Sequence, residues 1–369
     1  IIYVFILFGA LLEKTNMASV FLELACLVTR NAKGGPAKAA IFGSALFGSV
    51  SGSAVATSAA IGSIMGPEMV DRGYKPGYAA SLMAGAGAMG AIIPPSICFV
   101  VYASITGASV TKMLTAGIFP GLSVVLGLII LNCFISAKRG YGKSNYKYTA
   151  KEVLTITLQA IPALAMPVFV LGSIMSGIAT ATEAAAISVI YAFLLAAFAY
   201  GEMNFKQFVE ITKQSAMGTA FIFIIISASA PFGWVLAKNN IPMILANAIL
   251  SISSSKFVIT FLVVLLLIIL GTFMETNSLL ILLTPILWPV MESIGYNVVH
   301  FGIILCVAFA IGGCTPPMAV CLFTTTRILN IKVEDTFPDI FIICATMVVI
   351  LILITLIPEI SLFLPSLSG

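Results

Sequence analysis

The strongest constraint on the fold is an internal repeat, because much of the stretch from Gly271 to Pro317 has an earlier counterpart. At a shift of 222 positions (295 − 73), Gly295-Tyr296 falls on Gly73-Tyr74 and Pro316-Pro317 falls on Pro94-Pro95. These are the two Pro-Pro pairs of the chain, and each follows its Gly-Tyr pair at the same spacing. A long internal repeat means that one structural unit is built twice, so we interpret the fold as two related halves.

A second match lies upstream of the first. Phe8-Gly9 falls on Phe232-Gly233 at a shift of 224 positions (232 − 8), and Leu12 and Lys14 then fall on Leu236 and Lys238. The repeated unit therefore begins well before its Pro-Pro pair in each half.

The composition places the chain in a lipid bilayer. Hydrophobic residues make up 60% of it, charged residues make up 9%, and the mean hydropathy is +1.14. A soluble domain is about a quarter charged, and one this apolar would aggregate. We attribute the net charge of +4 to the membrane face that the loops occupy, so it does not indicate nucleic-acid binding. The seven cysteines lie singly in apolar runs, which is typical of buried free thiols.

Eight segments are predicted to be helices in or on the membrane. A spanning helix needs about 20 apolar residues. Five stretches meet this length: Leu114–Ala137, Val153–Ser176, Thr182–Tyr200, Gln214–Leu236 and Phe337–Ile357. Ile1–Leu12 resembles the end of another, so we expect residues before Ile1. Met17–Val28 and Ile241–Ser251 are predicted to be arm helices at the membrane interface.

Four segments are apolar but interrupted. Lys38–Met69 breaks at Gly48–Ser53, and Lys256–Met291 breaks at Gly271–Asn277, so each is predicted to be a re-entrant hairpin whose tip stops inside the membrane. Gly77–Ile105 and His300–Thr326 each contain a Pro-Pro pair, and proline removes a backbone donor and disfavours helix before it. These two segments are therefore predicted to be spanning helices with an unwound middle.

The resulting fold class is an all-α polytopic membrane protein of two inverted-topology repeats, each with a re-entrant hairpin and a Pro-broken helix. With this topology, one face collects 15 of the 18 basic residues and the other collects three, which orients the richer face to the cytoplasm and the C-terminus to the outside. The predicted divisions are 1–34 (scaffold helix end and arm), 35–113 (first transport repeat), 114–213 (connecting helices), 214–255 (scaffold helix and second arm), 256–336 (second transport repeat) and 337–369 (final helix).

A hairpin tip facing an unwound segment exposes backbone that can bind ions. Freed carbonyls with Ser or Thr hydroxyls suit sodium, and half-helix N-termini suit a carboxylate. The predicted sodium-binding residues are Ser49, Ser51, Gly52, Ser53, Gly90, Ile93 and Pro94 in the first half, and Gly271, Thr272, Met274, Glu275, Thr276, Gly312, Gly313, Thr315 and Pro316 in the second. The predicted substrate-binding residues are Ser53, Ala54, Pro95, Ser96, Thr276, Asn277 and Pro317.

Structural alternatives stand beside these assignments. Gly-Ser stretches in membrane helices also serve close helix packing. Glu275 either caps the helix that begins at Thr276 or acts near the ion, and Glu183 is interpreted as a helix-start cap rather than a ligand. His300, the one histidine, is interpreted as an interfacial residue rather than a proton relay. The chain has no Ser-His-Asp set and no phosphate loop, which excludes most enzyme classes. The inverted pair of broken helices favours an ion-coupled carrier over a passive channel.

Several runs of residues resemble one known family. They include Ala45–Val55, Gly62–Tyr74, Gly90–Ser96, Ala116–Gly121, Ala181–Ala186, Leu283–Pro289 and Gly295–Pro317, and they cover nearly the whole chain. The sequence resembles the large membrane subunit of tripartite ATP-independent periplasmic (TRAP) transporters, the DctM type. Glu13-Lys14-Thr15 and Gly34–Lys38 look closer to the branch whose small and large subunits are fused.

The resemblance implies a sodium-driven importer of organic acids, such as a C4-dicarboxylate or sialic acid, that works as an elevator in the bacterial inner membrane. Hairpins and broken helices would form the moving domain, surrounded by membrane lipid and a scaffold. It also implies two partners: a small membrane subunit, either separate or fused upstream of Ile1, and a periplasmic substrate-binding protein. The family's ion sites fall on the hairpin tips and Pro-Pro breaks, which the resemblance carries over here to Ser49–Ser53 with Ile93 and Pro94, and to Gly271–Thr276 with Gly313 and Thr315.

Cysteine labelling from the two sides of the membrane tests the hairpin prediction. Because a re-entrant hairpin enters and leaves by one face, cysteines placed beside Lys38 and Arg72 should both react with an impermeant reagent on the cytoplasmic side. Labelling of the two positions from opposite sides would exclude the predicted topology.

Overall fold

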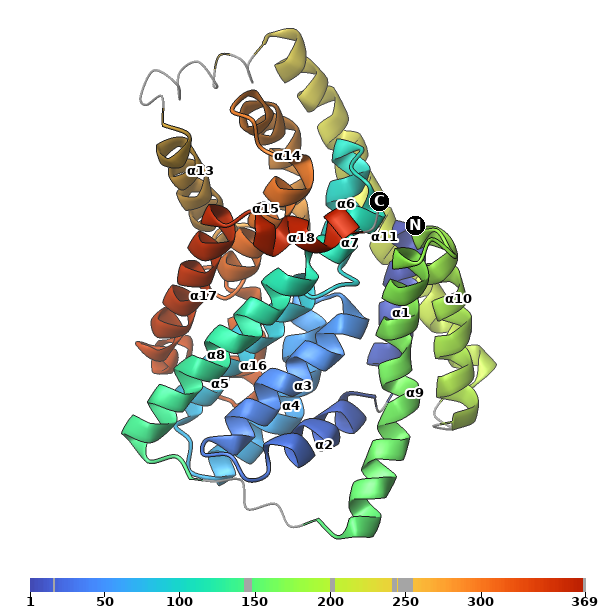
Figure 1. Ribbon diagram of the computed structural model, residues 1–369, viewed down its shortest axis with the longest axis vertical. Coiled ribbons are helices and arrows are strands. Elements are labelled where there is room, and N and C mark those ends of the chain that lie inside the picture. Colours follow the sequence, from blue (N-terminus) through green and yellow to red (C-terminus); the bar gives the residue numbers. More distant parts are fainter. Residues whose placement is uncertain (16, 143–147, 200–202, 241–243, 245–254, 368–369) are drawn as a thin grey trace.

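The computed structural model describes residues 1–15, 17–142, 148–199, 203–240, 244 and 255–367, and every regular element in that part is helical. The first half contains α1 (Ile2–Glu13), α2 (Met17–Thr29), α3 (Gly35–Ser51), α4 (Ala54–Asp71), α5 (Pro76–Ala88), η1 (Met89–Ala91), α6 (Ile97–Thr106), α7 (Val110–Ala116) and α8 (Ile118–Arg139). Figure 1 shows α2–α5 and α8 in the lower part of the molecule and α6 higher up, beside α14.

The rest of the chain forms the remaining helices. They are α9 (Ala150–Met175), α10 (Ala181–Leu194), η2 (Leu195–Ala199), α11 (Phe205–Lys238), α13 (Lys256–Gly271), α14 (Thr276–Ser293), α15 (Val298–Gly312), α16 (Val320–Ile328), η3 (Val333–Thr336), α17 (Asp339–Leu356) and α18 (Glu359–Leu367). The predicted second arm, Ile241–Ser251, lies almost wholly outside the described residues.

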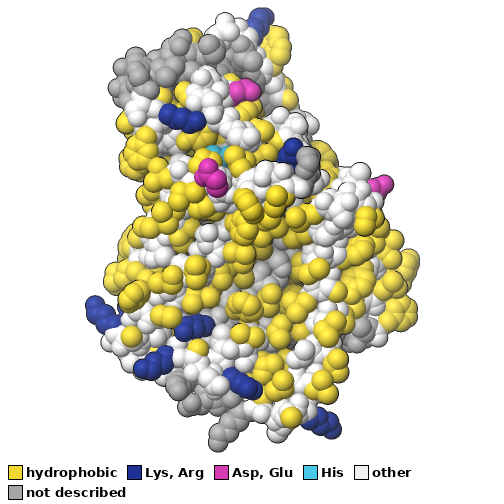
Figure 2. Space-filling model, in the orientation of Figure 1, with side chains coloured by type: hydrophobic (Ala, Val, Ile, Leu, Met, Phe, Trp, Pro, Cys, Tyr) yellow, Lys and Arg dark blue, Asp and Glu magenta, His cyan; other side chains and the backbone are white. Residues whose placement is uncertain are grey.

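Five helical stretches of the described chain are long and apolar enough to cross a bilayer, and each coincides with a predicted span. They are Val110–Arg139, Ala150–Met175, Ala181–Phe198, Phe205–Pro231 and Asp339–Leu356. In the view of Figure 2, a broad hydrophobic belt separates the two ends of the molecule, and basic side chains gather mainly at the lower end. The protein is therefore a multi-pass membrane protein.

Each predicted hairpin forms two consecutive helices joined by a short turn. Helices α3 and α4 lie against each other and turn at Gly52, whose φ of 66° is accessible to glycine at little cost. Ser53 then caps α4 by accepting a hydrogen bond from the Ala56 amide at 3.3 Å. Helices α13 and α14 turn between Gly271 and Thr276, and each packs more extensively against α15 than against the other. In Figure 1 the two hairpins lie at opposite ends of the molecule, with their turns towards its middle.

The two Pro-Pro pairs interrupt helices as predicted. Helix α5 continues through η1 and ends before Pro94-Pro95, and α6 begins at Ile97. Helix α15 ends at Gly312, and α16 begins only at Val320, after Pro316-Pro317. Both breaks follow from the missing proline N–H and the clash of the ring with the preceding turn.

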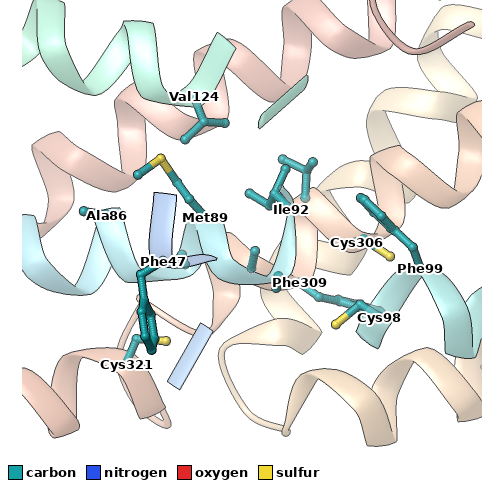
Figure 3. Packing of buried hydrophobic residues seen from close by; sticks show 14 of the residues in the cluster. Phe47, Ala86, Met89, Ile92, Cys98, Phe99, Val124, Cys306, Phe309 and Cys321 are labelled. Atoms are coloured by element: carbon teal, nitrogen blue, oxygen red, sulfur yellow. The ribbon is translucent and has the colours of Figure 1, made fainter. Parts of the chain in front are cut away.

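The breaks lie around a common hydrophobic core. Figure 3 shows Phe47 of α3, Met89 of η1, Val124 of α8, Phe309 of α15 and Cys321 of α16 in one cluster. Each of these side chains is at most 2% exposed. Residues from both halves of the sequence thus pack between the two breaks, which fixes the broken helices relative to each other.

The final helix α18 was not predicted, and it buries His300. The imidazole is only 2% exposed, because α18 folds back over α15 and covers it. Its Nδ1 lies 2.6 Å from the Ser361 hydroxyl, and its ring stacks parallel to Tyr296. His300 is therefore packed within the protein beneath α18.

An ion pair between Arg139 and Asp339 joins the end of α8 to the start of α17. The Arg139 side chain is 25% exposed and the Asp339 side chain 7% exposed. The guanidinium also lies 5.3 Å from the ring centre of Tyr78, whose hydroxyl donates to Asn132 Oδ1 at 3.0 Å. This cluster connects α5, α8 and α17 at one end of the molecule.

Asp339→Asn should lower the unfolding temperature of the purified protein in detergent, because it leaves a largely buried guanidinium without its counter-charge. We expect a loss of about 1–3 kcal/mol, below the roughly 3–5 kcal/mol of a fully buried pair. Glu334→Gln, at an exposed position of η3, is the control and should leave the unfolding temperature unchanged. Equal unfolding temperatures for both variants would show that the ion pair contributes nothing.

Candidate functional site

The first hairpin tip lies directly against the first helix break. The Ile97 amide, at the start of α6, donates to the Gly52 carbonyl at 3.4 Å. Glycines allow the close approach, since a Cβ added to Gly48 would lie 2.9 Å from the Gly90 Cα. A Cβ on Gly52 would meet the Pro95 carbonyl oxygen at 2.7 Å. Tip and break therefore meet through backbone, as the sequence predicted from their exposed polar groups.

The second tip and break repeat this arrangement. The Met318 amide, just beyond the second Pro-Pro pair, donates to the Thr272 carbonyl at 2.8 Å. A Cβ on Gly312 would lie 2.7 Å from the Gly271 carbonyl oxygen. A glycine pair and one backbone hydrogen bond thus join hairpin to break in each half.

The predicted residues of the first sodium site do not all converge. Gly52, Ser53 and Gly90 do, because a Cβ on Gly90 would lie 2.5 Å from the Ser53 carbonyl oxygen. The Ser49 hydroxyl instead donates to the Leu46 carbonyl of its own helix at 2.7 Å. Pro94 is buried in the unwound segment. The Ile93 side chain packs against Gly121 of α8, because a Cβ added to Gly121 would collide with it. Ile93 can therefore offer a cation only its backbone carbonyl.

The predicted residues of the second site behave similarly. The Thr272 hydroxyl donates to the Ile269 carbonyl at 2.7 Å, and the Thr315 hydroxyl donates to the Ile311 carbonyl at 2.8 Å. Both oxygens keep lone pairs for a cation. Thr276 lies beside Gly313, whose Cβ would be 4.0 Å from the Thr276 hydroxyl. Met274 is exposed at the tip, and Pro316 is half-buried in the break.

The capping interpretation of Glu275 is confirmed. Its Oε2 accepts a hydrogen bond from the Ser278 amide at 2.9 Å at the start of α14, and its Oε1 accepts one from Asn277 Nδ2 at 2.8 Å. Glu183 is likewise a cap, because its carboxylate accepts from the Thr180 amide at 2.8 Å in a reciprocal capping box. The exposed Glu275 carboxylate retains acceptor capacity for an ion.

Three helix N-termini meet at the predicted substrate position. Helix α4 begins beside Ser53, and Gly52 next to it bonds to the first residue of α6. Cys98, the second residue of α6, donates from its thiol to Asn277 Oδ1 at 3.7 Å. This contact joins the start of α6 to the start of α14. The Ser96 hydroxyl turns to the Ala91 carbonyl at 2.6 Å and so does not cap α6. Helix N-termini carry partial positive charge, so this junction can hold an anion.

The turn before Ser53 and Ala54 contacts the break at Pro95 and Ile97, and the Cys98 thiol links the start of α6 to Asn277 of the second half. Pro317 is exposed at the second break, and no described contact links it to the junction. Residue Glu13, at the end of α1, was not predicted as a site residue. It accepts a hydrogen bond from Ser51 at 3.3 Å, and an isolated carboxylate after an apolar run is the one sequence signal that it carries.

A separate cavity of about 550 Å³ lies between α1, α6, α11 and α14. Its lining is mostly apolar, with two hydroxyls, and includes Ile2, Ser104, Phe223, Ser229 and Pro285. This cavity contains none of the predicted site residues, so it is a second location in which a ligand could be sought.

Comparison with known proteins gives a consistent result. A family model for the "Tripartite ATP-independent periplasmic transporter, DctM component" matches residues 1–360. The chain is 36% identical over 359 residues to the isethionate TRAP transporter permease protein DctMQ of Oleidesulfovibrio alaskensis, which covers 97% of the chain and 56% of that protein. It is 34% identical over 366 residues to the C4-dicarboxylate TRAP transporter large permease protein DctM of Pseudomonas aeruginosa, covering 99% and 85%.

The sialic acid TRAP transporter large permease protein SiaM of Vibrio cholerae is 32% identical over 363 residues, covering 98% of the chain and 85% of that protein. The chain thus spans little more than half the length of the DctMQ protein and most of the length of the other two.

Gly312→Ala should separate the second tip from its break, because the added methyl group would collide with the Gly271 backbone. Overpacking of this kind costs about 1–3 kcal/mol. We expect faster hydrogen–deuterium exchange in the peptide that contains the Met318 amide. Gly172→Ala, in an open position of α9, is the control and should leave that peptide unchanged. Unchanged exchange in Gly312→Ala would contradict the backbone contact.

Proposed function

The chain belongs to the DctM family of large membrane subunits of TRAP transporters, and we propose that it imports an organic acid anion together with sodium ions. Members of this family are transporters and not enzymes. The fold agrees with that role, since its predicted site lies between broken helices inside a multi-pass membrane protein. Substrate, ions and partners are argued below from the residues present.

The observation that carries the proposal is the junction of three helix N-termini at Ser53, Ser96 and Thr276. The starts of α4 and α6 contribute partial positive charge, which suits a negatively charged group, whereas the start of α14 is already capped by the Glu275 carboxylate and contributes polar side chains. The three relatives are named for isethionate, C4-dicarboxylates and sialic acid, all of which are organic anions. We therefore assign an organic anion as the cargo and place its charged group at this junction.

Sodium coupling is supported by the two tip-and-break contacts. Carbonyl oxygens and hydroxyls near Gly52 and Gly90, and near Thr272 and Thr315, are the ligand types that a hard cation uses. Each positive charge that moves inward through a membrane potential of 100 mV supplies about 2.3 kcal/mol, so sodium in excess of the substrate charge can drive accumulation. The sequence contains no nucleotide-binding motif that would supply energy in another way.

An elevator built from inverted repeats is the mechanism that we propose. The hairpins and broken helices form one packed unit, through contacts of α4 and α5 with α16 and of α6 with α14. Helices α1, α9, α10 and α11 form contacts among themselves and are assigned to the scaffold. The position of the two hairpins at opposite ends of the molecule supports inversion, since each would enter the membrane from its own side (Figure 1).

The proposed setting is the bacterial inner membrane, with the C-terminus in the periplasm. The asymmetry of basic residues supports this orientation. We also propose that the chain works with a small membrane subunit and with a periplasmic substrate-binding protein, as members of a tripartite system do. The small subunit is either separate or fused before Ile1, and the match to the longer DctMQ protein favours neither arrangement by itself.

An ion channel, or an ion-coupled carrier without a binding protein, is the second candidate. Counterflow separates these possibilities, because a carrier exchanges labelled substrate against an unlabelled gradient and saturates, whereas a channel does not exchange. Dependence of uptake on added substrate-binding protein distinguishes the tripartite carrier from a solitary one.

Thr315→Val should raise the sodium concentration for half-maximal uptake in proteoliposomes. The change removes the hydroxyl oxygen beside the second break and keeps the side-chain shape, and loss of one such interaction is worth about two- to tenfold in affinity. Thr346→Val on α17 is a matched control, because its hydroxyl makes the same bond to a carbonyl four residues earlier at an exposed position. An unchanged sodium dependence in Thr315→Val would refute its assignment.

A further inference from the structure

The end of helix α1 touches the tip of the first hairpin. The Ser51 hydroxyl donates to Glu13 Oε1 at 3.3 Å, and Gly9 faces the same turn, since its Cβ would lie 2.6 Å from the Ser51 carbonyl oxygen. Glu13 is the last residue of α1, and its side chain is exposed. A carboxylate from outside the hairpin therefore lies next to the first proposed sodium site.

The two halves obtain a carboxylate from different elements. Glu275 of the second tip falls on Ser53 of the first at the repeat shift of 222 positions (275 − 53), so the first tip has no acidic residue at that place. On the flanking helix it is the first half that carries the acidic residue, because Glu13 falls on Ala237 at the shift of 224 positions (237 − 13). The second half thus places its carboxylate on the hairpin, and the first half places it on α1.

The attachments of the two carboxylates differ as well. Glu275 is hydrogen-bonded to Asn277 and Ser278 of its own hairpin, so its carboxylate would move together with the tip. Glu13 belongs to α1, which packs mainly against α10 and α11 and less extensively against α3 and α6, and its described hydrogen bond to the first tip is with Ser51. Among the described residues no ion pair holds Glu13, and the adjacent Lys14 lines a pocket with Gln207 and Glu210 of α11.

We propose that Glu13 gives the first tip a negative charge only while that tip lies against α1, so that cation affinity there depends on the position of the hairpin. The inference rests on the proposed function, because it needs a sodium-coupled carrier whose hairpins move relative to α1. A nearby carboxylate attracts a cation, and solvent weakens the attraction at an exposed position. Sodium would be held when tip and α1 touch and released more readily when they separate.

The test measures sodium dependence of uptake in proteoliposomes. Glu13→Gln keeps an acceptor for Ser51 and removes the charge, so the sodium concentration for half-maximal uptake should rise by about two- to fivefold, the range expected for a partly solvated charge. The maximal rate should change less than this concentration. Glu23→Gln, which removes an exposed carboxylate from α2, is the matched control and should behave as the unmodified protein. Unchanged sodium dependence in Glu13→Gln would overturn the proposal.

A second measurement tests the moving contact directly. The double variant Glu13→Cys with Ser51→Cys is treated with a short bifunctional methanethiosulfonate, and uptake is compared before treatment, after it and after reduction. We expect reversible inhibition that neither single variant shows, because the cross-link holds the tip against α1. Full activity with the cross-link in place would overturn the moving contact.

The two failures are distinguishable. If the unmodified protein takes up substrate without any sodium dependence, the proposed sodium coupling is wrong and the role of Glu13 falls with it. If the unmodified protein depends on sodium and only Glu13→Gln fails to change that dependence, the carrier stands and the role of Glu13 alone is wrong.

Discussion

The structure depends on the pairing of backbone groups that broken helices leave free inside a membrane. In hydrocarbon no water is available for these groups, so each must find a partner within the protein. Here the tip of a hairpin supplies that partner, through the bonds from Ile97 to Gly52 and from Met318 to Thr272. Close glycine pairs permit the approach. A hairpin and a broken helix therefore form one unit, and the chain contains this unit twice.

Much of this unit could be predicted from the sequence because its determinants are local. A Pro-Pro pair ends a helix wherever it falls, and the breaks lie where Pro94-Pro95 and Pro316-Pro317 indicated. The capping roles of Glu183 and Glu275 follow from their spacing to the helix starts, and both are confirmed. The long apolar helices could also be predicted because their determinants are local: the length and composition of a segment decide whether it can cross a bilayer.

Other features depend on contacts between distant segments and could not be predicted. The burial of His300 follows from the position of α18, which returns over α15 and brings Ser361 to the ring. The place of Glu13 beside Ser51 follows from how α1 packs on the hairpin, and nothing within α1 itself specifies that. The hydroxyls of Ser49 and Thr272 bond to their own helices, an arrangement that composition cannot distinguish from ligation.

The central proposal is that cargo binds where the two units meet, at the helix starts and carbonyl oxygens beside the breaks. A density map of the protein in lipid, with sodium and a transported organic anion, tests this most directly. The account predicts the charged group of the anion at the junction of Ser53, Ser96 and Asn277, with sodium beside the tips. Density for the anion in the apolar cavity between α1, α6, α11 and α14, with the junction empty, would contradict it.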